Sequence, residues 1–561
     1  MAIRVSKLLR DLNIGLDTLE KILIALDYKE TPLDLNTKIP DNIVNLVMGC
    51  FSSDAYKDMH LLGGSQNKLT DMSPLQYDDK QSFWINELVV LSSEERDDCI
   101  KIGTFDETEG LPHYSVIIGT NGVGKSTLMK EMVDFFIDLR ACVTESEQRT
   151  TSVNKGRLKR IRYYIDGLEC EVTRLGKSFI AKIDGQFRKL SDLRIPSIVA
   201  CHFGAFDKFP TQKVNGSLQT RYDVPYYKYI GAHVNGNMIS SSAIAFRLLF
   251  ALSEQMDDRQ RRNICSILDL IGYDHRISLS YSFVLKSRKD GAVRDVITQR
   301  VEKDKEYKIY SKKEKNEIVS KLYVFYKNKT DSGKTQFDYN VDFDRDSTSK
   351  GSFDELNYIY KLKQCDLINS VNVLFHKQGC KVTSDEMSSG EFAMLSTVLS
   401  VSAAVNDVHT LVLIDEPELS LHPNWQMSLI DNLDRALVGK TCHLLIATHS
   451  HMLVSDLPMQ RSIVVQIEKD EVGNLNSTII SECTYGWSAE EVLLKVFKTA
   501  TDRNKYLAEI VGTLLRKIGD NSITTEEVRT QVGFLRSVSD NLSDVDPMKK
   551  IIFTIIDGFS R

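Results

Sequence analysis

The chain has 561 residues, of which 42% are hydrophobic and 26% charged, and its formal net charge is -6. This is the composition of an ordinary globular protein, and the charge argues against a uniformly basic nucleic-acid-binding surface, although a local basic patch would be hidden in the sum. The absence of any run of eighteen apolar residues predicts no membrane span. The ten cysteines form no CxxC pair and the start lacks an apolar signal core, so reduced thiols in the cytoplasm are expected.

Residues 1–52 are expected to form a small helical module, because apolar side chains recur there at helical spacing. The segment resembles the N-terminal helical module of bacterial translation initiation factor two, in residues 3–9 and 23–28. The resemblance implies contact with RNA or with a partner protein, and a generic three-helix docking module is the alternative. Residues 53–82 are polar and glycine-containing, which predicts a linker.

A glycine-rich loop lies within residues 83–150, the first part of a predicted ATPase head. It follows an apolar run at 114–118, and a helical spacing of apolar residues begins at Leu128. A strand, a glycine-rich loop and a helix in this order are typical of a phosphate-binding loop. Backbone N–H groups surround the phosphates, Lys125 reaches the β and γ phosphates, and the Ser126 hydroxyl binds Mg²⁺. The predicted ATP-binding residues are Gly119, Thr120, Asn121, Gly122, Val123, Gly124, Lys125, Ser126 and Thr127.

Residues 151–375 are expected to form an inserted lobe. Strict alternation of apolar and polar residues over 156–190, with Asp-Gly turns, predicts an antiparallel meander. Residues 286–350 are charged and poor in apolar side chains, which favours a solvated helix or a mobile insertion. A basic contact strip for nucleic acid is the alternative interpretation. Heptads do not persist in this region, so no long coiled-coil arm is expected.

Two acids end an apolar strand in the second part of the predicted head, residues 376–482. Apolar residues at 410–414 lead directly to Asp415 and Glu416, as in a buried strand that ends at the phosphate edge of a parallel sheet. Asp415 is the predicted Mg²⁺ ligand, directly or through water. Glu416 is the predicted base that polarises the attacking water.

A second anion site is predicted where small residues precede an apolar helix, at Ser388, Ser389, Gly390 and Glu391. The alternative is an ordinary helix with a serine N-cap. A further apolar strand then delivers His449 to the same sheet edge.

These four elements, in this order, resemble the head of an ABC-type ATPase. The resemblance implies an α/β fold: an ABC-type P-loop head with an inserted α+β lobe, a small N-terminal helical module and a C-terminal helical region. It implies ATP and Mg²⁺ as cofactors. It also implies a signature, Ser388 to Glu391, that contacts ATP held by the opposite subunit, and a catalytic His449 that contacts the γ-phosphate and holds the attacking water.

The chain departs from the usual signature, with Ser389 at a glycine position and Glu391 at a glutamine position. Together with the stretch at 418–426, these departures favour the SMC-like, RecF-like and OLD-like ATPases over transporters. Residues 200–203 are the candidate for the glutamine loop.

Within that group the chain resembles the PtuA ATPases of Septu-type antiphage systems, including retron-linked versions. Such ATPases work with a separate HNH nuclease. This agrees with the absence of an HNH or toprim residue set in the sequence, whose residues 483–561 are predicted to be helical. The stretches that carry the resemblance are 206–210, 416–418, 421–423, 448–450 and 484–488.

The resemblance implies a homodimer or higher oligomer that controls an HNH nuclease in an antiviral defence complex. In retron-linked versions the complex includes a reverse transcriptase and its DNA or RNA. Two other functions stay open: a RecF-like or SMC-like DNA-repair ATPase, and a regulatory ATPase that binds RNA or the ribosome.

Overall fold

A computed structural model describes most of the chain from residue 81 onward, so the expected module at 1–52 and the linker at 53–82 lie almost wholly outside the described residues. Within the module, β1 (Ile3–Arg4) pairs with β2 (Lys38–Ile39). The described residues are 3–5, 7, 9, 19, 37–39, 44, 81–91, 97–103, 105, 110–143, 156–176, 178–204, 207–211, 221–222, 224–231, 233–234, 237–238, 245–246, 249, 258–284, 290–303, 311–332, 334, 336–344, 354–365, 367–405, 409–419, 421–455, 457–470, 473–480, 484, 486–497, 499, 504–520, 524–539, 542 and 546–559.

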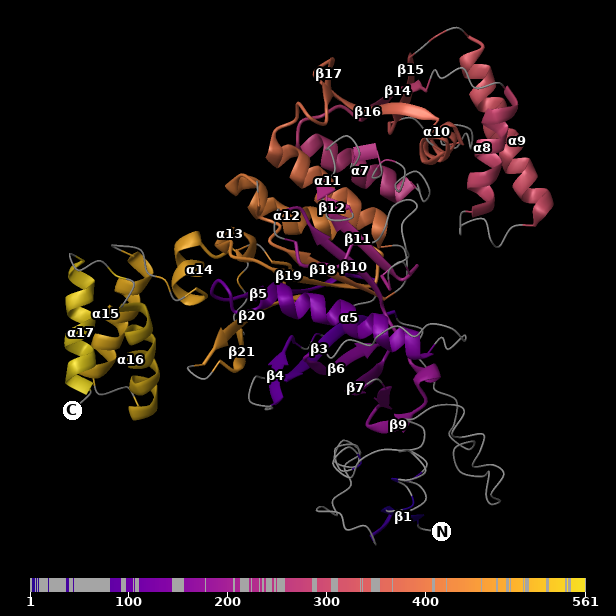
Figure 1. The fold of residues 1–561 in the computed structure, drawn as a ribbon. Helices are drawn as coiled ribbons and strands as arrows, with labels where there is room; N and C mark the ends of the chain where they lie inside the picture. The colour runs from indigo at the N-terminus through magenta and orange to yellow at the C-terminus, as the bar shows by residue number, and fades with distance from the viewer. Residues whose placement is uncertain are drawn as a thin grey trace.

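A seven-stranded sheet in the order β11-β10-β18-β19-β5-β20-β21 forms the centre of the molecule (Figure 1). Neighbouring strands are parallel except for the β20–β21 pair. Three of the central strands are buried along their whole length, which explains why they read as continuous apolar runs in the sequence. The strands are β5 (His113–Ile118), β10 (Ser197–His202), β11 (Tyr227–Gly231), β18 (Thr410–Asp415), β19 (Cys442–Ala447), β20 (Ser462–Lys469) and β21 (Leu475–Ile480).

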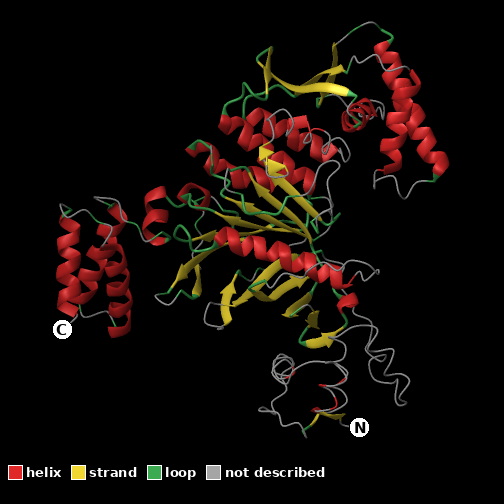
Figure 2. Cartoon of the chain, in the orientation of Figure 1, coloured by secondary structure: helices red, strands yellow, loops and turns green. Residues whose placement is uncertain are grey.

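Helices cover both faces of this sheet, as Figure 2 shows. Side chains of β18 alternate between two cores: Leu411 and Leu413 pack with the buried residues of α5 (Lys125–Val143), whereas Val412 and Ile414 pack with those of α11. The second face carries α11 (Ser389–Ala404), α12 (Pro423–Ala436) and α13 (His451–Val454). The α/β class predicted from the sequence is confirmed.

A six-stranded antiparallel sheet, in the order β4-β3-β6-β7-β8-β9, packs on the far side of α5. Strand β3 precedes the glycine-rich loop and pairs with β6, which follows it. The expected domain boundary between residues 150 and 151 therefore divides the strands of one sheet. The sequence also placed the segments of β10 and β11 in the lobe, whereas both strands belong to the central sheet. The elements are β3 (Phe83–Leu91), β4 (Asp97–Lys101), β6 (Leu158–Ile165), β7 (Leu168–Leu175), β8 (Ser178–Ile183), β9 (Gln186–Arg188) and the 3-10 turn η2 (Leu190–Asp192).

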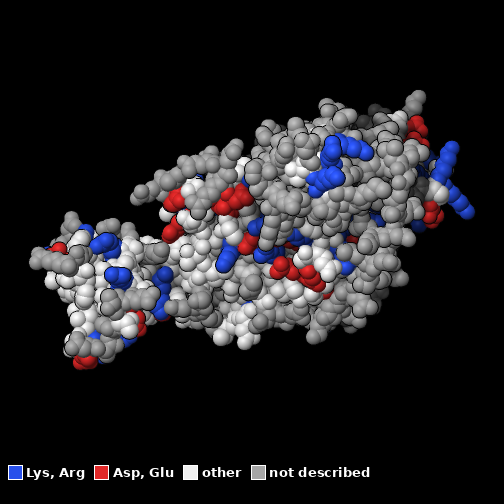
Figure 3. All heavy atoms as spheres, turned by 90° about the horizontal axis from the view of Figure 1, so that it is seen from below, with Lys and Arg blue, Asp and Glu red and all other residues white. Residues whose placement is uncertain are grey.

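The antiparallel sheet carries charges of both signs on its outer side, where Arg160 and Arg162 lie near Glu87 and Glu171. The face of the molecule in Figure 3 likewise shows basic and acidic side chains close together in its described part. This part of the surface is not a uniform basic field.

The lobe contains a four-stranded antiparallel sheet, β15-β14-β16-β17, with helices beside it. The charged region at 286–350 contains two helices, α8 and α9, which lie side by side, and the capping box of Ser311 and Glu314 begins α9. The elements are α7 (Asp258–Leu270), β14 (Arg276–Phe283), α8 (Asp290–Lys303), α9 (Lys312–Thr330), β15 (Gln336–Asp342), α10 (Asp354–Gln364), β16 (Ile368–Lys377) and β17 (Cys380–Thr383), preceded by the short strands β12 (His233–Val234) and β13 (Asn237–Met238).

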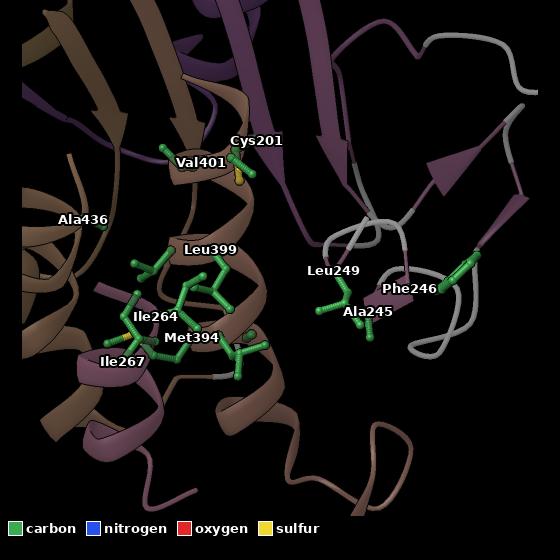
Figure 4. Packing of buried hydrophobic residues seen from close by; sticks show 14 of the residues in the cluster. Cys201, Ala245, Phe246, Leu249, Ile264, Ile267, Met394, Leu399, Val401 and Ala436 are labelled. Carbon is green, nitrogen blue, oxygen red and sulfur yellow. The ribbon is translucent and has the colours of Figure 1, made fainter. Parts of the chain in front are cut away.

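Helix α7 lies between the lobe and the head. Figure 4 shows Ile264 and Ile267 of α7 pointing toward Met394 and Leu399 of α11. All four side chains are at most 3% exposed and belong to one apolar core. Helix α7 of the lobe is thus fixed on the head by ordinary core packing.

The described residues after 483 are helical and have an apolar core of their own around Leu507, Leu535 and Ile552. None of the described helices is long and apolar enough to cross a membrane. The helices are α14 (Ala489–Lys495), α15 (Lys505–Gly519), α16 (Thr525–Ser539) and α17 (Pro547–Phe559).

Candidate nucleotide site at the edge of the central sheet

The glycine-rich loop connects β5 to α5, and its glycines meet two different needs. Gly122 and Gly124 have φ angles of 79° and 112°, which favour glycine, and a Cβ at either would meet nothing within 4 Å. A Cβ at Gly119, by contrast, would lie 2.4 Å from the carbonyl oxygen of Ile467 on β20. Gly119 therefore allows the loop to pack on β20, while Gly122 and Gly124 leave an open concave backbone that can receive an anion.

Lys125 is the first residue of α5, and its side chain turns back into the loop. It is 6% exposed, and its Nζ atom donates to the carbonyl oxygen of Gly119 at 2.9 Å and lies 2.8 Å from Nε2 of His449. Burial lowers the pKa of Lys125, while the charges of Asp415, Glu416 and Glu418 oppose that shift. The structure thus brings together two predicted residues that are 324 positions apart in the chain.

Asp415 ends β18 in a buried position, with an exposure of 3%. Its Oδ1 atom is buried and has no hydrogen-bond partner. Burial raises the pKa of the Asp415 carboxyl, and a hydrogen bond with Ser126 partly offsets this. The unpartnered carboxylate oxygen of Asp415 and the hydroxyl oxygen of Ser126 are two neighbouring oxygen ligands of the kind that Mg²⁺ takes.

Glu416 follows Asp415 with a φ angle of 48°, in the left-handed region that residues with a side chain rarely adopt. Its N–H group donates to the carbonyl oxygen of Ala447 at the end of β19, at 2.8 Å. The strained backbone turns the chain sharply at the sheet edge. Glu416 thereby stays close enough to influence the pKa values of Lys125 and His449.

Glu418, a partly buried carboxylate to which the sequence alone assigned no role, holds the His449 loop. It accepts hydrogen bonds from the backbone N–H of His449 at 2.7 Å and from the hydroxyl of Thr448 at 2.8 Å. Burial raises the pKa of Glu418 against the effect of these two donors. The only sequence signal was a second acid two residues after Glu416.

The imidazole of His449 faces a cation and is held in its neutral form. Burial and the neighbouring charge of Lys125 lower its pKa. Since Lys125 is a donor, the Nε2 atom that faces it acts as the acceptor. A neutral imidazole at this position can accept a proton or orient a water molecule.

His202, at the end of β10, reaches the same edge. Its Nδ1 atom lies 2.8 Å from the backbone oxygen of Asp415, and its buried Nε2 atom has no hydrogen-bond partner. The candidate stretch for the glutamine loop, 200–203, therefore ends beside the predicted metal ligand.

Two lysines that the sequence reasoning gave no role lie at the rim of the loop. Lys208 donates to the Thr127 hydroxyl at 3.1 Å, and Lys469 donates to the Gly122 carbonyl oxygen at 3.3 Å. Both add positive charge where phosphates would bind.

The predicted signature lies apart from these residues. Ser388 is the N-cap of α11 and forms a capping box with Glu391, whose carboxylate also accepts hydrogen bonds from Lys377 at 2.7 Å and Tyr273 at 3.3 Å. Burial raises the pKa of Glu391, but the hydrogen bonds from Lys377 and Ser388 outweigh it and leave the pKa low. The alternative interpretation, a capped helix, thus describes the local geometry, and Ser389 and Gly390 stay outside the capping box.

Figure 1 shows α11 and α5 on opposite sides of the central sheet. The described hydrogen bonds of Ser388 and Glu391 run to each other and to lobe residues, not to the phosphate loop. Within one chain, the signature and the phosphate loop are therefore separate surfaces.

Comparisons with known proteins found similar solved structures and a matching sequence family. Among solved structures, the chain is similar to the SMC head domain from Thermotoga maritima, with 10% identity, 71% of this chain and 99% of that chain covered, and a TM-score of 0.31. It is also similar to the Smc head domain with an extended coiled coil, bound to the C-terminal domain of ScpA, from Pyrococcus furiosus, with 10% identity, 71% and 96% covered and a TM-score of 0.28. An SmcHead bound to the C-winged helix domain of ScpA gives 11% identity, 71% and 98% covered and a TM-score of 0.29.

The sequence itself matches a family model described as an AAA ATPase domain over residues 102–454, which is more than half of the chain. The matched range begins before the phosphate loop and ends after His449, so it includes Lys125, Asp415, Glu416 and His449. The chain belongs to the AAA ATPase domain family.

Proposed function

We propose that this protein is a Mg²⁺-dependent ATP phosphohydrolase. The observation that carries the proposal is the convergence of Lys125, Ser126, Asp415 and His449 at one sheet edge, from segments far apart in the chain. Bound Mg²⁺ would withdraw charge from the phosphates of ATP. Ser126 and Asp415 are the residues that would hold it.

The charge and hydrogen-bonding capacity of Lys125, Glu416 and His449 give each of them a different role in hydrolysis. Lys125 gives up its contact with Gly119 to a phosphate, because a phosphate oxygen is a charged acceptor and a carbonyl is not. Glu416 polarises the attacking water. His449, kept neutral and held through its backbone by Glu418, orients that water and the terminal phosphate.

The completed site takes its second half from another copy of the chain. Support comes from the separation of the signature and the phosphate loop within one chain, and from the position of Ser388 to Glu391 at the N-terminus of α11, because helix N-termini favour anions. A head-to-tail dimer would hold two ATP molecules, each between the loop of one subunit and Ser388 to Glu391 of the other.

The biological role that we propose is control of a separate HNH nuclease in an antiviral defence complex, in retron-linked versions with a reverse transcriptase and its nucleic acid. It is supported by the sequence stretches named above, among them Asp207–Pro210, whose Lys208 contacts Thr127 of the loop. Closure and reopening of the ATP-loaded dimer would change how the nuclease is held.

The Glu416→Gln variant tests the proposal. It keeps the size of the side chain and removes the base, so we expect it to bind ATP, to stop hydrolysing it and to accumulate as closed dimers. Size-exclusion chromatography with light scattering, with and without ATP and Mg²⁺, measures this accumulation, and a phosphate-release assay measures turnover. Unchanged turnover would overturn the assignment of Glu416, and a monomer that hydrolyses ATP would overturn the dimer.

The biological role has its own test. Copurification with an HNH nuclease whose activity changes in the Glu416→Gln background supports it. ATP turnover stimulated by DNA without any nuclease partner would favour a repair ATPase, and RNA lost on deletion of residues 1–52 would favour an RNA-binding regulator.

A further inference from the structure

Three side chains that can bind a metal ion lie together at the junction of α7 and the lobe sheet, away from the nucleotide site. Cys265, His275 and Asp344 offer a sulfur, a nitrogen and an oxygen atom that all lie within 4.8 Å of one another. No other grouping of this kind occurs among the described residues. We propose that these three side chains form a binding site for a divalent transition-metal ion, with Zn²⁺ as the ion that the donors fit best.

The donor set selects the metal class. Magnesium and calcium take oxygen ligands, whereas Zn²⁺ takes thiolate, imidazole and carboxylate together in tetrahedral sites. Three protein ligands leave a fourth position for water or for a backbone oxygen. The carbonyl oxygen of Phe343 lies 3.8 Å from Sγ of Cys265.

The histidine is already oriented as a zinc ligand. Its Nε2 atom lies 2.8 Å from Oδ1 of Asp269, and its Nδ1 atom lies 2.6 Å from Oδ1 of Asp344. A carboxylate on the outer nitrogen fixes the ring and its tautomer, as in many metal-bound histidines. Asp269 accepts the hydrogen bond of the Nε2–H group, so the Nδ1 atom beside Asp344 is the nitrogen that would bind the metal ion, in place of the proton that it shares with Asp344.

The groups are carried by a helix and by the residues next to two paired strands. Cys265 and Asp269 are four residues apart on α7 and share one face of the helix, beside the face that Ile264 and Leu268 bury in the core. His275 and Asp344 flank the ends of two paired strands, β14 and β15, where the N–H of Phe343 donates to the carbonyl oxygen of His275 at 2.9 Å. Elements, not loop tips, therefore set the spacing of the donors.

One further hydrogen bond connects α7 to the segment that follows β15. Arg261, one turn before Cys265 on α7, donates to the carbonyl oxygen of Phe343 at 2.9 Å. A metal ion would strengthen this same junction, because it would bond α7 directly to both strands of the β14–β15 pair at one end of that pair. The bound ion would thus fasten the lobe to the helix that packs on α11.

The test uses the full-length protein, freed of metal with a chelator that is then removed. Zn²⁺ is titrated in competition with a chromophoric chelator, and Co²⁺ is added separately, because a thiolate bound to Co²⁺ gives a charge-transfer absorption band. We expect both metals to bind, the thiolate band to appear, and Zn²⁺ to raise the thermal unfolding midpoint.

Four variants assign the ligands. Cys265→Ser should abolish the thiolate band and the Zn²⁺-dependent stabilisation, and His275→Gln should abolish the stabilisation as well. Asp269→Asn should weaken Zn²⁺ binding by about 10- to 100-fold, the usual effect of losing an outer carboxylate. Cys380→Ser, which removes the exposed thiol of β17, is the matched control and should behave as wild type.

Each variant is compared with wild type in the absence of metal, where equal unfolding midpoints show that it folds. A thiolate band or a stabilisation that survives in Cys265→Ser would overturn the site. Wild-type protein that gains neither the band nor stability from metal would overturn it as well, and would leave His275 as the centre of an ion-pair network with Asp269 and Asp344.

Discussion

Glu418 offers a sharp test of the nucleotide site, because its carboxylate holds the His449 loop by accepting hydrogen bonds from Thr448 and His449. The Glu418→Ala variant removes both acceptor contacts. Hydrogen bonds to a charged group contribute about 1.5 to 3 kcal/mol each, so about 3 to 6 kcal/mol of contact energy is lost. Part of this is regained because the buried carboxylate no longer has to be desolvated, and we expect a net loss of about 2 kcal/mol of unfolding free energy.

The larger effect is expected on catalysis. Without Glu418 the His449 backbone is no longer fixed, and a displacement of about 1 Å in a catalytic group lowers the rate by about 100-fold. ATP affinity should change by less than about threefold, since the phosphate loop and Lys125 are untouched. The Glu418→Gln variant, whose amide can accept from only one of the two donors, should lie between wild type and Glu418→Ala.

Steady-state phosphate release gives kcat, and equilibrium titration with a slowly hydrolysed ATP analogue gives affinity. Glu314→Ala is a matched control, because it also removes a carboxylate that accepts a backbone hydrogen bond, but at the start of α9 in the lobe. It should lower stability by about 1 kcal/mol or less and leave kcat unchanged. Full kcat in Glu418→Ala, measured where the variant is folded, would refute the reasoning.

Three other changes test single groups of the site. Lys125→Ala removes a charged donor to phosphate and should weaken ATP binding by about 10- to 100-fold, measured by calorimetry; unaltered affinity would contradict the loop assignment. Asp415→Asn should abolish the Mg²⁺ dependence of ATP binding. It should also raise the unfolding free energy slightly, because burial disfavours the charged carboxylate and raises its pKa, whereas the amide is neutral. A destabilised variant with normal Mg²⁺ dependence would contradict the assignment of Asp415. Folding lowers the pKa of His449, so its neutral imidazole is compatible with full stability above pH about 6.5. That stability is lost as the pH falls through the pKa that His449 has in the folded protein. The kcat/KM profile should therefore have an acidic limb below pH about 6.5, and a limb that persists in His449→Asn would have to belong to another group.

The central sheet could be predicted because its signals are local. Val116 to Ile118, 411–414 and 443–447 read as buried strands from their apolar runs alone, and each is followed within a few residues by loop or acidic residues that carry chemistry. Parallel strands then place their carboxyl ends at one edge, which is why Lys125 and His449 could be expected near each other without knowledge of the strand order.

The parts that could not be predicted depend on pairing between distant segments. The apolar residues of β3 predict a strand but not its partner, and only the folded sheet shows that the partner is β6 on the other side of the phosphate loop. Likewise, nothing local to Glu391 indicates that Lys377 and Tyr273 converge on it. Glu418 was missed for the same reason, since both of its donors lie 30 or more positions away.

The central claim, that each ATP site combines two chains, is tested most directly by mixing two inactive variants. Lys125→Ala destroys the phosphate loop and keeps the signature, whereas Ser389→Arg blocks the signature and keeps the loop. In an equal mixture about half of the dimers pair one variant with the other, and each of these has one intact site of two, so about one quarter of the wild-type ATPase activity should return. A mixture that stays as inactive as its two components, although the chains exchange and form mixed dimers, would contradict the shared site.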